Sequence, residues 1–230
     1  MHVGALWQRG AMAEGDVAVL LERGRSRVFA IAVDWPGWER SASARAGDEA
    51  ALEALASYRS RYAEVATRAG VPFVGDGAAM RVVAEAVGTA TTDFGAPDVI
   101  VDADRPVVGA AGRRDLARRT SLLEAVWALL DDVVAAAPEV LAKGPRGGGR
   151  DTSEIVAHVV NAERAYARKV GVRHRPFAPD DRVARDAMRA ELLVALRTDD
   201  PSFAWPARYA LRRTAWHLLD HAWEIQDKSV

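Results

Sequence analysis

Residues 207–228 read ARYALRRTAWHLLDHAWEIQDK, and this stretch decides the fold of the second half of the chain. Apolar side chains recur around most of the circumference of a helix drawn through it, which predicts a long and largely buried helix. One narrow polar stripe remains at helical spacing. Buried polar groups need hydrogen-bond partners or a ligand. The stripe is therefore the first place to look for a site, and its members are Arg213, Thr214, His217, Asp220, His221 and Glu224.

Two histidines of this stripe are spaced for a shared ligand. His217 and His221 are four residues apart, so their imidazoles lie on one face of the helix. A third histidine, His158, lies in EIVAHVVNAERAY at 154–166, which has a helical period of its own. Three imidazoles from two facing helices form a three-nitrogen site for a divalent metal, with coordination positions left open.

The rarity of histidine supports the metal site. The chain has five histidines, and two of them, His2 and His174, fall at the N-terminus and in a Pro-containing loop. The other three lie on two predicted helices. The alternative is a set of interior histidines with satisfied hydrogen bonds beside a salt-bridged stripe, which the pair on one helix would favour by itself. The third histidine, on a second helix, favours the metal.

Composition narrows the class of protein. Half of the 230 residues are hydrophobic, enough for a sizeable core in one or two domains of a bacterial-style protein. The formal net charge of −1 argues against binding nucleic acid through phosphate contacts. The chain has no cysteine, so a disulfide framework, a thiolate ligand and a cysteine nucleophile are all excluded. We expect neither a signal peptide nor a membrane span, which makes the cytoplasm the expected location.

Short segments with strand-like alternation dominate the first hundred residues, and they are separated by turn residues such as the Pro36-Gly37 pair. One amphipathic helix interrupts them. We therefore predict an α+β protein whose N-terminal domain, at 1–100, has the order β-β-β-α-β. Its elements are strands at 17–22, 27–33 and 38–43, a helix at 48–69 and a strand at 80–91.

The chain changes character near residue 110. Glycine and proline break the segment from 92 to 113, and we predict a linker at 101–112. Beyond it the hydrophobic period is helical throughout, which predicts an all-α four-helix bundle at 113–230. Its helices are expected at 115–141, 151–170, 181–197 and 207–228.

A glycine-rich run, Gly144 to Arg150, leads into the second of these helices. Backbone N–H groups at a helix N-terminus can bind an anion, and Arg146 and Arg150 would assist. The run matches neither a P-loop nor a dinucleotide-binding fingerprint. A flexible connection between helices is the favoured interpretation, and an anion site is the alternative.

The histidine-bearing segments resemble the DinB/YfiT family of four-helix bundles. The resemblance covers about 113–230 and is carried by His158 in EIVAHVVNAERAY and by His217 and His221 in RTAWHLLDHAWEIQDK. It implies a divalent metal, Zn, Ni or Fe, bound by the three histidines. It also implies a transferase or isomerase that uses a low-molecular-weight thiol. The Ala- and Arg-rich composition is typical of a high-GC genome, which makes mycothiol the first choice of thiol.

The first domain resembles the HicB-like antitoxin fold. The stretch VFAIAVDWPGWERSASARAGDEAALEAL, at 28–55, has a strand, a Pro-Gly turn and a helix in the order of that family. The family implies neutralisation of a small RNA-cleaving toxin, often with a DNA-binding tail. Here the metal-type bundle stands in place of the tail. The sheet would then serve as a scaffold, a dimerisation surface or a lid.

The polar neighbours of the three histidines have expected roles. Asp220 and Glu224 lie on the same helix and could orient the ligands, and Glu154 precedes His158 by one turn. Arg213 lies one turn before His217 and could bind a substrate carboxylate. For each of these residues a structural salt bridge is the alternative. The sequence does not identify a residue that performs the chemistry itself.

Two classes of function remain. The first is a metal-dependent enzyme, a thiol-dependent transferase, an isomerase or a hydrolase, acting on a small-molecule substrate. The second is a non-catalytic stress- or toxin-antitoxin-related interaction protein that works through its HicB-like domain. We expect no membrane partner and no nucleic acid partner, and a homodimer is an expected assembly.

Overall fold

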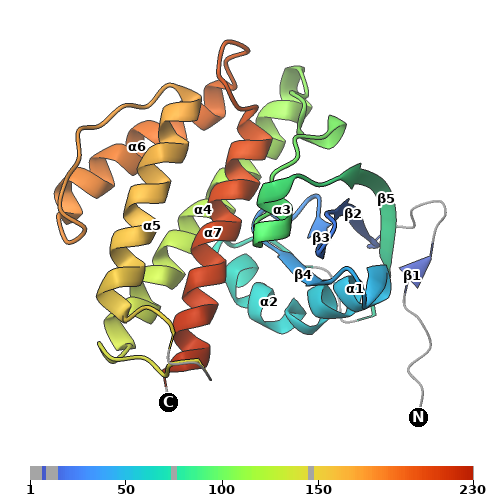
Figure 1. The fold of residues 1–230 in the computed structure, drawn as a ribbon. Coiled ribbons are helices and arrows are strands. Elements are labelled where there is room, and N and C mark those ends of the chain that lie inside the picture. Colours follow the sequence, from blue (N-terminus) through green and yellow to red (C-terminus); the bar gives the residue numbers. More distant parts are fainter. Residues whose placement is uncertain (1–6, 9–14, 74–76, 145–147, 230) are drawn as a thin grey trace. The chain divides into compact units, whose positions relative to one another are not determined.

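The computed structural model describes residues 7–8, 15–73, 77–144 and 148–229 of the chain. The protein divides into two compact units, Met1–Ala103 and Asp104–Val230. The first combines a sheet with helices and the second is helical, which confirms the α+β class (Figure 1). Within the described ranges, none of the helices has both the length and the apolar character that a membrane span requires.

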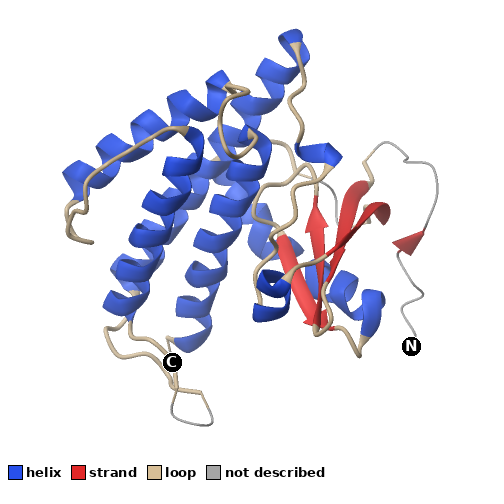
Figure 2. Cartoon of the chain, turned by 45° about the horizontal axis from the view of Figure 1, so that its top comes forward, coloured by secondary structure: helices blue, strands red, loops and turns tan. Residues whose placement is uncertain are grey.

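The first unit is built on a mixed five-stranded sheet (Figure 2). Its strands are β1 (Trp7–Gln8), β2 (Val17–Arg23), β3 (Arg27–Ala32), β4 (Glu39–Ser43) and β5 (Met80–Val87), in the spatial order β1-β5-β2-β3-β4. The neighbours β2, β3 and β4 pair antiparallel, whereas β5 runs parallel to both β1 and β2. The central strands β2 and β3 are almost entirely buried, as their apolar sequences VAVLLER and RVFAIA require.

Two helices cover this sheet, α1 (Gly47–Ser57) and α2 (Arg59–Arg68), and a short helix, α3 (Ala90–Phe94), follows β5. Helix α1 packs against β3 and β4. The core beneath is aromatic: the fully buried ring of Trp38 stacks on Tyr62 with centroids 5.6 Å apart. The predicted order β-β-β-α-β corresponds to β2, β3, β4, the α1 and α2 pair, and β5, with β1 as an additional strand.

The single helix predicted at 48–69 is wrong, because the structure has two helices that meet at Tyr58. Tyr58 has φ −95° and ψ 4°, outside the helical region. Its neighbourhood explains the break. The indole Nε1 of Trp38 donates to the carbonyl oxygen of Leu55 at 2.9 Å, and that oxygen is the acceptor an unbroken helix would offer to Arg59.

The strand predicted at 80–91 ends earlier, at Val87. Thr89 then caps α3, its hydroxyl oxygen accepting a hydrogen bond from the backbone N–H of Thr91 at 3.0 Å. Gly88 permits this turn, because a Cβ there would lie 2.7 Å from the hydroxyl oxygen of Thr92. The capping threonines therefore convert the end of the predicted strand into the start of a helix.

Four long helices make up most of the second unit: α4 (Gly109–Ala136), α5 (Thr152–Ala167), α6 (Arg182–Thr198) and α7 (Ala207–Lys228). Helix α7 packs against α4, α5 and α6, and α6 also packs against α4 and α5 (Figure 1). Sixteen residues of α7 are buried, in agreement with its apolar circumference. Two short 3-10 helices, at Asp102–Asp104 and Arg168–Val170, complete the described elements.

The boundaries of α4 differ from those predicted. The helix begins at Gly109, so residues 109–112 are helical and not part of a linker. Gly112 makes this start possible, because a Cβ there would lie 1.5 Å from the carbonyl oxygen of Val107. The helix ends at Ala136 and not at residue 141, since Pro138 follows directly after the C-cap.

Candidate metal centre

The helix that carries His158 begins with a capping box. The carboxylate of Asp151 accepts from the backbone at the start of α5, and the carboxylate of Glu154 accepts from the backbone N–H of Asp151 at 2.9 Å. The hydroxyl of Thr152 also donates to the carbonyl oxygen of Pro138 at 2.6 Å. These bonds fix the start of α5, and with it the position of His158 nearly two turns later.

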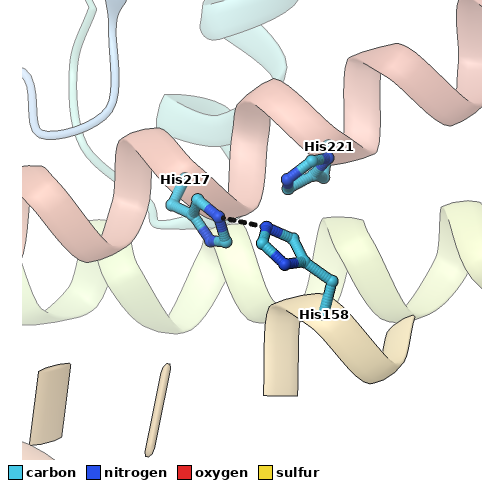
Figure 3. Close-up of side chains that lie close together, drawn as sticks. All are labelled: His158, His217 and His221. Atoms are coloured by element: carbon cyan, nitrogen blue, oxygen red, sulfur yellow. Dashed lines mark hydrogen bonds between the residues drawn. The ribbon is translucent and has the colours of Figure 1, made fainter. Parts of the chain in front are cut away.

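The three histidines converge (Figure 3). Their ligand nitrogens all lie within 4.8 Å of one another, and the Nε2 atoms of His158 and His217 are 3.1 Å apart. The ring of His221 lies edge-on to both other rings, at centroid distances of 5.0 and 4.7 Å. His217 and His221 are each 8 % exposed, and His158 is half-buried. The structure thus brings together the three side chains that the sequence singled out.

This arrangement fits a divalent metal ion. Nitrogens bound to one tetrahedral Zn²⁺ at about 2.0–2.1 Å lie about 3.3 Å from each other. The 3.1 Å between the two Nε2 atoms is close to that spacing, and rotations of the imidazole rings reduce the longer separations. Three imidazole nitrogens suit Zn, Ni or Fe, and they leave at least one coordination position for a non-protein ligand.

The protonation state of His217 favours metal binding. Its pKa is lowered to about 2, mainly by burial and to a smaller extent by the nearby charges of His221, His158, Arg213 and Arg150. Burial is also the main reason that the pKa of His158 is lowered. Both rings are therefore neutral near pH 7, so a metal does not have to displace a proton from them.

Glu224 orients one of the three ligands. Its Oε2 lies 2.8 Å from Nδ1 of His221, and its Oε1 accepts from Nζ of Lys228 at 2.6 Å. The pKa of Glu224 is lowered to about 2. The hydrogen bond from His221 is the largest cause, and the hydrogen bond from Lys228 acts in the same direction. A carboxylate on Nδ1 holds the proton there and leaves the Nε2 lone pair free to bind a metal.

Aromatic rings form a wall beside the histidines. The ring of Tyr166 lies edge-on to His217 at 5.7 Å and contacts Trp205 at 5.3 Å. Trp205 in turn lies perpendicular to Tyr209 at 4.9 Å. Tyr166 therefore covers one side of His217, and less water on that side would strengthen electrostatic interactions there.

Arg213 lies one turn before His217 on α7 and is 7 % exposed. Its guanidinium carbon is 4.8 Å from the ring centroid of Trp216 and 5.6 Å from that of Tyr166. The two rings that touch Arg213 also touch His217, at 6.1 and 5.7 Å. The structure therefore joins Arg213 to the histidine cluster through shared aromatic neighbours.

The other sequence-predicted residues have different positions. Glu154 takes part in the capping box, so its carboxylate serves the start of α5. Asp220 is half-buried on α7, and its orienting role stays a prediction. His174 lies 3.1 Å from the carboxylate of Glu191, and His2 lies outside the described residues.

The glycine-rich connection leads into a helix N-terminus that is already capped by a side chain of the protein. Asp151 supplies its own carboxylate to the N-terminus of α5, at the position where an external anion would bind. Arg146 lies outside the described residues, whereas Arg150 is exposed and contributes to the lowered pKa of His217.

Sequence reasoning did not identify two contributors to the site. Lys228 supports Glu224, and its position four residues later on the same helix was a usable signal. Trp205 lies before α7 in a segment without a regular period, so its contact with Tyr166 had no local signal.

No protein-family model, no curated protein and no solved structure matches this chain. Its function is therefore inferred from the site itself: three converging imidazoles, one orienting carboxylate and one buried guanidinium.

Proposed function

We propose that the second unit binds one divalent metal ion through His158, His217 and His221, and that the protein is a metal- and thiol-dependent enzyme acting on a small molecule. The observation that carries this proposal is the approach of three imidazole nitrogens within 4.8 Å of one another. The carboxylate of Glu224 on Nδ1 of His221 supports it, because metal-bound histidines commonly have such a partner.

We further infer that helices α4 to α7 form a four-helix bundle of the DinB/YfiT type. Two features support this. Each of the four helices packs against at least two of the others. The three histidines also lie on the second and fourth of these helices, α5 and α7, which is the order on which the resemblance to that family was based.

The absence of cysteine directs the chemistry. A bound divalent metal supplies Lewis acidity and lowers the pKa of a thiol in its open position. The chain has no thiol of its own, so the thiol is an external small molecule, with mycothiol as the first choice. In the transfer reaction the thiol sulfur would form a bond to an electrophilic carbon of the substrate while the bond from that carbon to its leaving group breaks. The leaving group departs with the electron pair of that bond, and the thiol proton passes to solvent.

The residues of the chain have distinct roles in this reaction. The metal would be bound by His158, His217 and His221. Glu224 holds the proton on Nδ1 of His221, and Tyr166 excludes water from one side of the histidines. An isomerase or a hydrolase could use the same arrangement.

The test is turnover of a panel of small electrophiles with mycothiol, glutathione or bacillithiol. We expect product only when both a thiol and the metal are present, and we expect a chelator to abolish it. Protein that has been treated with a thiol-directed alkylating reagent and then freed of it should keep its activity, since the chain has no cysteine. His174→Ala is the control and should keep full activity. Turnover that a chelator leaves unchanged would contradict the proposal.

A second function is favoured by the first unit. The elements β3, β4 and α1 cover the residues that carry the HicB resemblance, in the order that family has. On this proposal residues 1–103 bind a protein partner and the metal in the second unit is structural. Full thiol-dependent activity of the protein, lost on metal removal, would contradict it.

A further inference from the structure

Two adjacent arginines of α7 are buried in different ways. Arg212 is 3 % exposed and Arg213 is 7 % exposed. Arg212 donates from Nε and Nη2 to the two carboxylate oxygens of Asp104, both at 2.8 Å. Among the residues that the structure describes, Arg213 has neither a carboxylate partner nor a hydrogen-bond acceptor, and its Nη1 is buried without one.

Burial of Nη1 without an acceptor is costly, because this charged nitrogen has lost its hydration and gained no hydrogen bond in return. The faces of Trp216 and Tyr166, at 4.8 and 5.6 Å, offset only part of that cost. The two rings restrict the guanidinium group, which leaves its N–H groups as the means by which it can bind. A restricted guanidinium loses less entropy when it binds an anion.

The carboxylate nearest to the histidines does not serve Arg213. Both oxygens of Glu224 have partners, Oε2 on His221 and Oε1 on Lys228. The described part of the chain therefore provides Arg213 with no carboxylate partner beside the cluster of three imidazoles. A divalent metal would add further positive charge. The charge balance is met by a ligand that brings its own negative group.

We infer that Arg213 binds the anionic group, a carboxylate or a phosphate, of the small molecule that acts at the three histidines. This inference rests on the proposed function and names its substrate class. Arg213 and His217 are four residues apart, which is about 6 Å along the helix axis. A ligand that reaches both residues carries its anionic group apart from the end that faces the histidines. The planar fork of arginine matches the two oxygens of either anion.

The first test is anion binding by the metal-free full-length protein. Inorganic phosphate and acetate serve as probes, and tryptophan fluorescence with calorimetry serves as the readout, since Trp216 contacts the guanidinium. We expect Arg213→Met to raise the dissociation constant about 10-fold or more, because a charge-assisted hydrogen bond is lost. The dissociation constant of Arg213→Lys should lie between those of the wild type and Arg213→Met. The control, Arg114→Met, removes an exposed arginine of α4 and should bind as the wild type does.

Equal binding of both anions by Arg213→Met and by the wild type would overturn the inference, and so would the absence of binding by the wild type. Phosphate and acetate also distinguish the two anion classes, because the tighter probe shows which group the site prefers. Metal titration of Arg213→Met is a separate readout. It should give a metal affinity within a few-fold of the wild type, whereas failure of the wild type to bind metal would contradict the proposed function alone.

A stability measurement separates a binding role from a structural one. Arg213→Met removes an unsatisfied buried charge, so the metal-free protein should melt at the same or a higher temperature. Arg212→Met removes two hydrogen bonds from the buried carboxylate of Asp104 and should lower the melting temperature sharply. A comparable fall in both variants would show that Arg213 holds the fold together, and that result would overturn the inference.

Discussion

Glu224 Oε2 lies 2.8 Å from Nδ1 of His221, one turn along the same helix, and this contact determines which nitrogen of His221 faces the other two histidines. The carboxylate accepts a hydrogen bond from Nδ1–H and keeps the proton on Nδ1, so the Nε2 lone pair is free. Because Lys228 occupies the other oxygen of Glu224, the carboxylate cannot turn away without losing a second hydrogen bond.

Glu224→Gln should lower metal affinity by about 10- to 100-fold, since an amide accepts a weaker hydrogen bond from Nδ1 and can present its NH₂ group instead. The fold should persist. Isothermal titration with Zn²⁺ measures the affinity, and circular dichroism checks the helices. Glu154→Gln is the matched control, because its carboxylate serves the start of α5. An unchanged Zn²⁺ affinity in Glu224→Gln would show that Glu224 does not orient His221.

The metal-free protein should lose stability as the pH falls below about 6.5. His217 has a pKa of about 2 in the folded state against 6.5 for the free group, so the unfolded state takes up the proton first. Stability from this group is present above pH 6.5 and decreases toward pH 2, by roughly 1 kcal/mol per pH unit. Glu224, with a folded pKa of about 2 against 4.5, adds to the loss below pH 4.5.

Urea unfolding between pH 8 and pH 4 measures this dependence. His217→Gln should flatten the slope between pH 6.5 and 4.5, because glutamine does not titrate. The same slope in the variant and in the wild type would assign the loss of stability to other groups.

Glu22→Ala should destabilise the first unit by about 3 kcal/mol, because the buried carboxylate satisfies three donors. Its oxygens accept from the hydroxyl of Thr92 at 2.6 Å and from the backbone N–H groups of Asp98 and Val99 at 2.8 and 3.1 Å. Glu85→Ala is the control. That half-exposed partner of Arg23 should cost about 1 kcal/mol or less, as surface ion pairs do. Denaturant unfolding compares the two, and equal losses would contradict the account.

Thermolysin should cut the chain first near Val107 and Val108, which are 44 % and 89 % exposed. The residues that precede this stretch are held by hydrogen bonds. The backbone N–H of Val99 donates to Glu22, and Arg212 donates to Asp104. N-terminal sequencing of the fragments locates the cut. A first cut within α5 or α7 would contradict the exposure that the structure gives this segment.

The three histidines could be predicted from the sequence because each lies in a long segment with a clear helical period. Four-residue spacing then fixes the shared face of His217 and His221. The missed features depend on distant contacts. The break at Tyr58 follows from the hydrogen bond that Trp38 donates to Leu55, and the early start of α4 follows from the close approach of Gly112 to Val107. Neither contact can be predicted from the local hydrophobic period of the sequence.

The structure was also needed to identify Arg213, and not Arg212, as the arginine available for binding. The sequence places two arginines side by side on α7, and nothing in their spacing shows that Asp104 pairs with Arg212 and not with Arg213. Asp104 lies 108 residues before its partner, so only the fold reveals which guanidinium has no carboxylate.

The metal content of untagged protein tests the central claim most directly. Protein loaded with Zn²⁺ or Ni²⁺, freed of excess metal and analysed by mass spectrometry should contain about one metal ion per chain. His158→Ala, His217→Ala and His221→Ala should each reduce that content sharply, because two remaining nitrogens hold a metal poorly, whereas His174→Ala should leave it unchanged. Near-stoichiometric metal in the triple alanine variant, or none in the wild type, would contradict the metal centre.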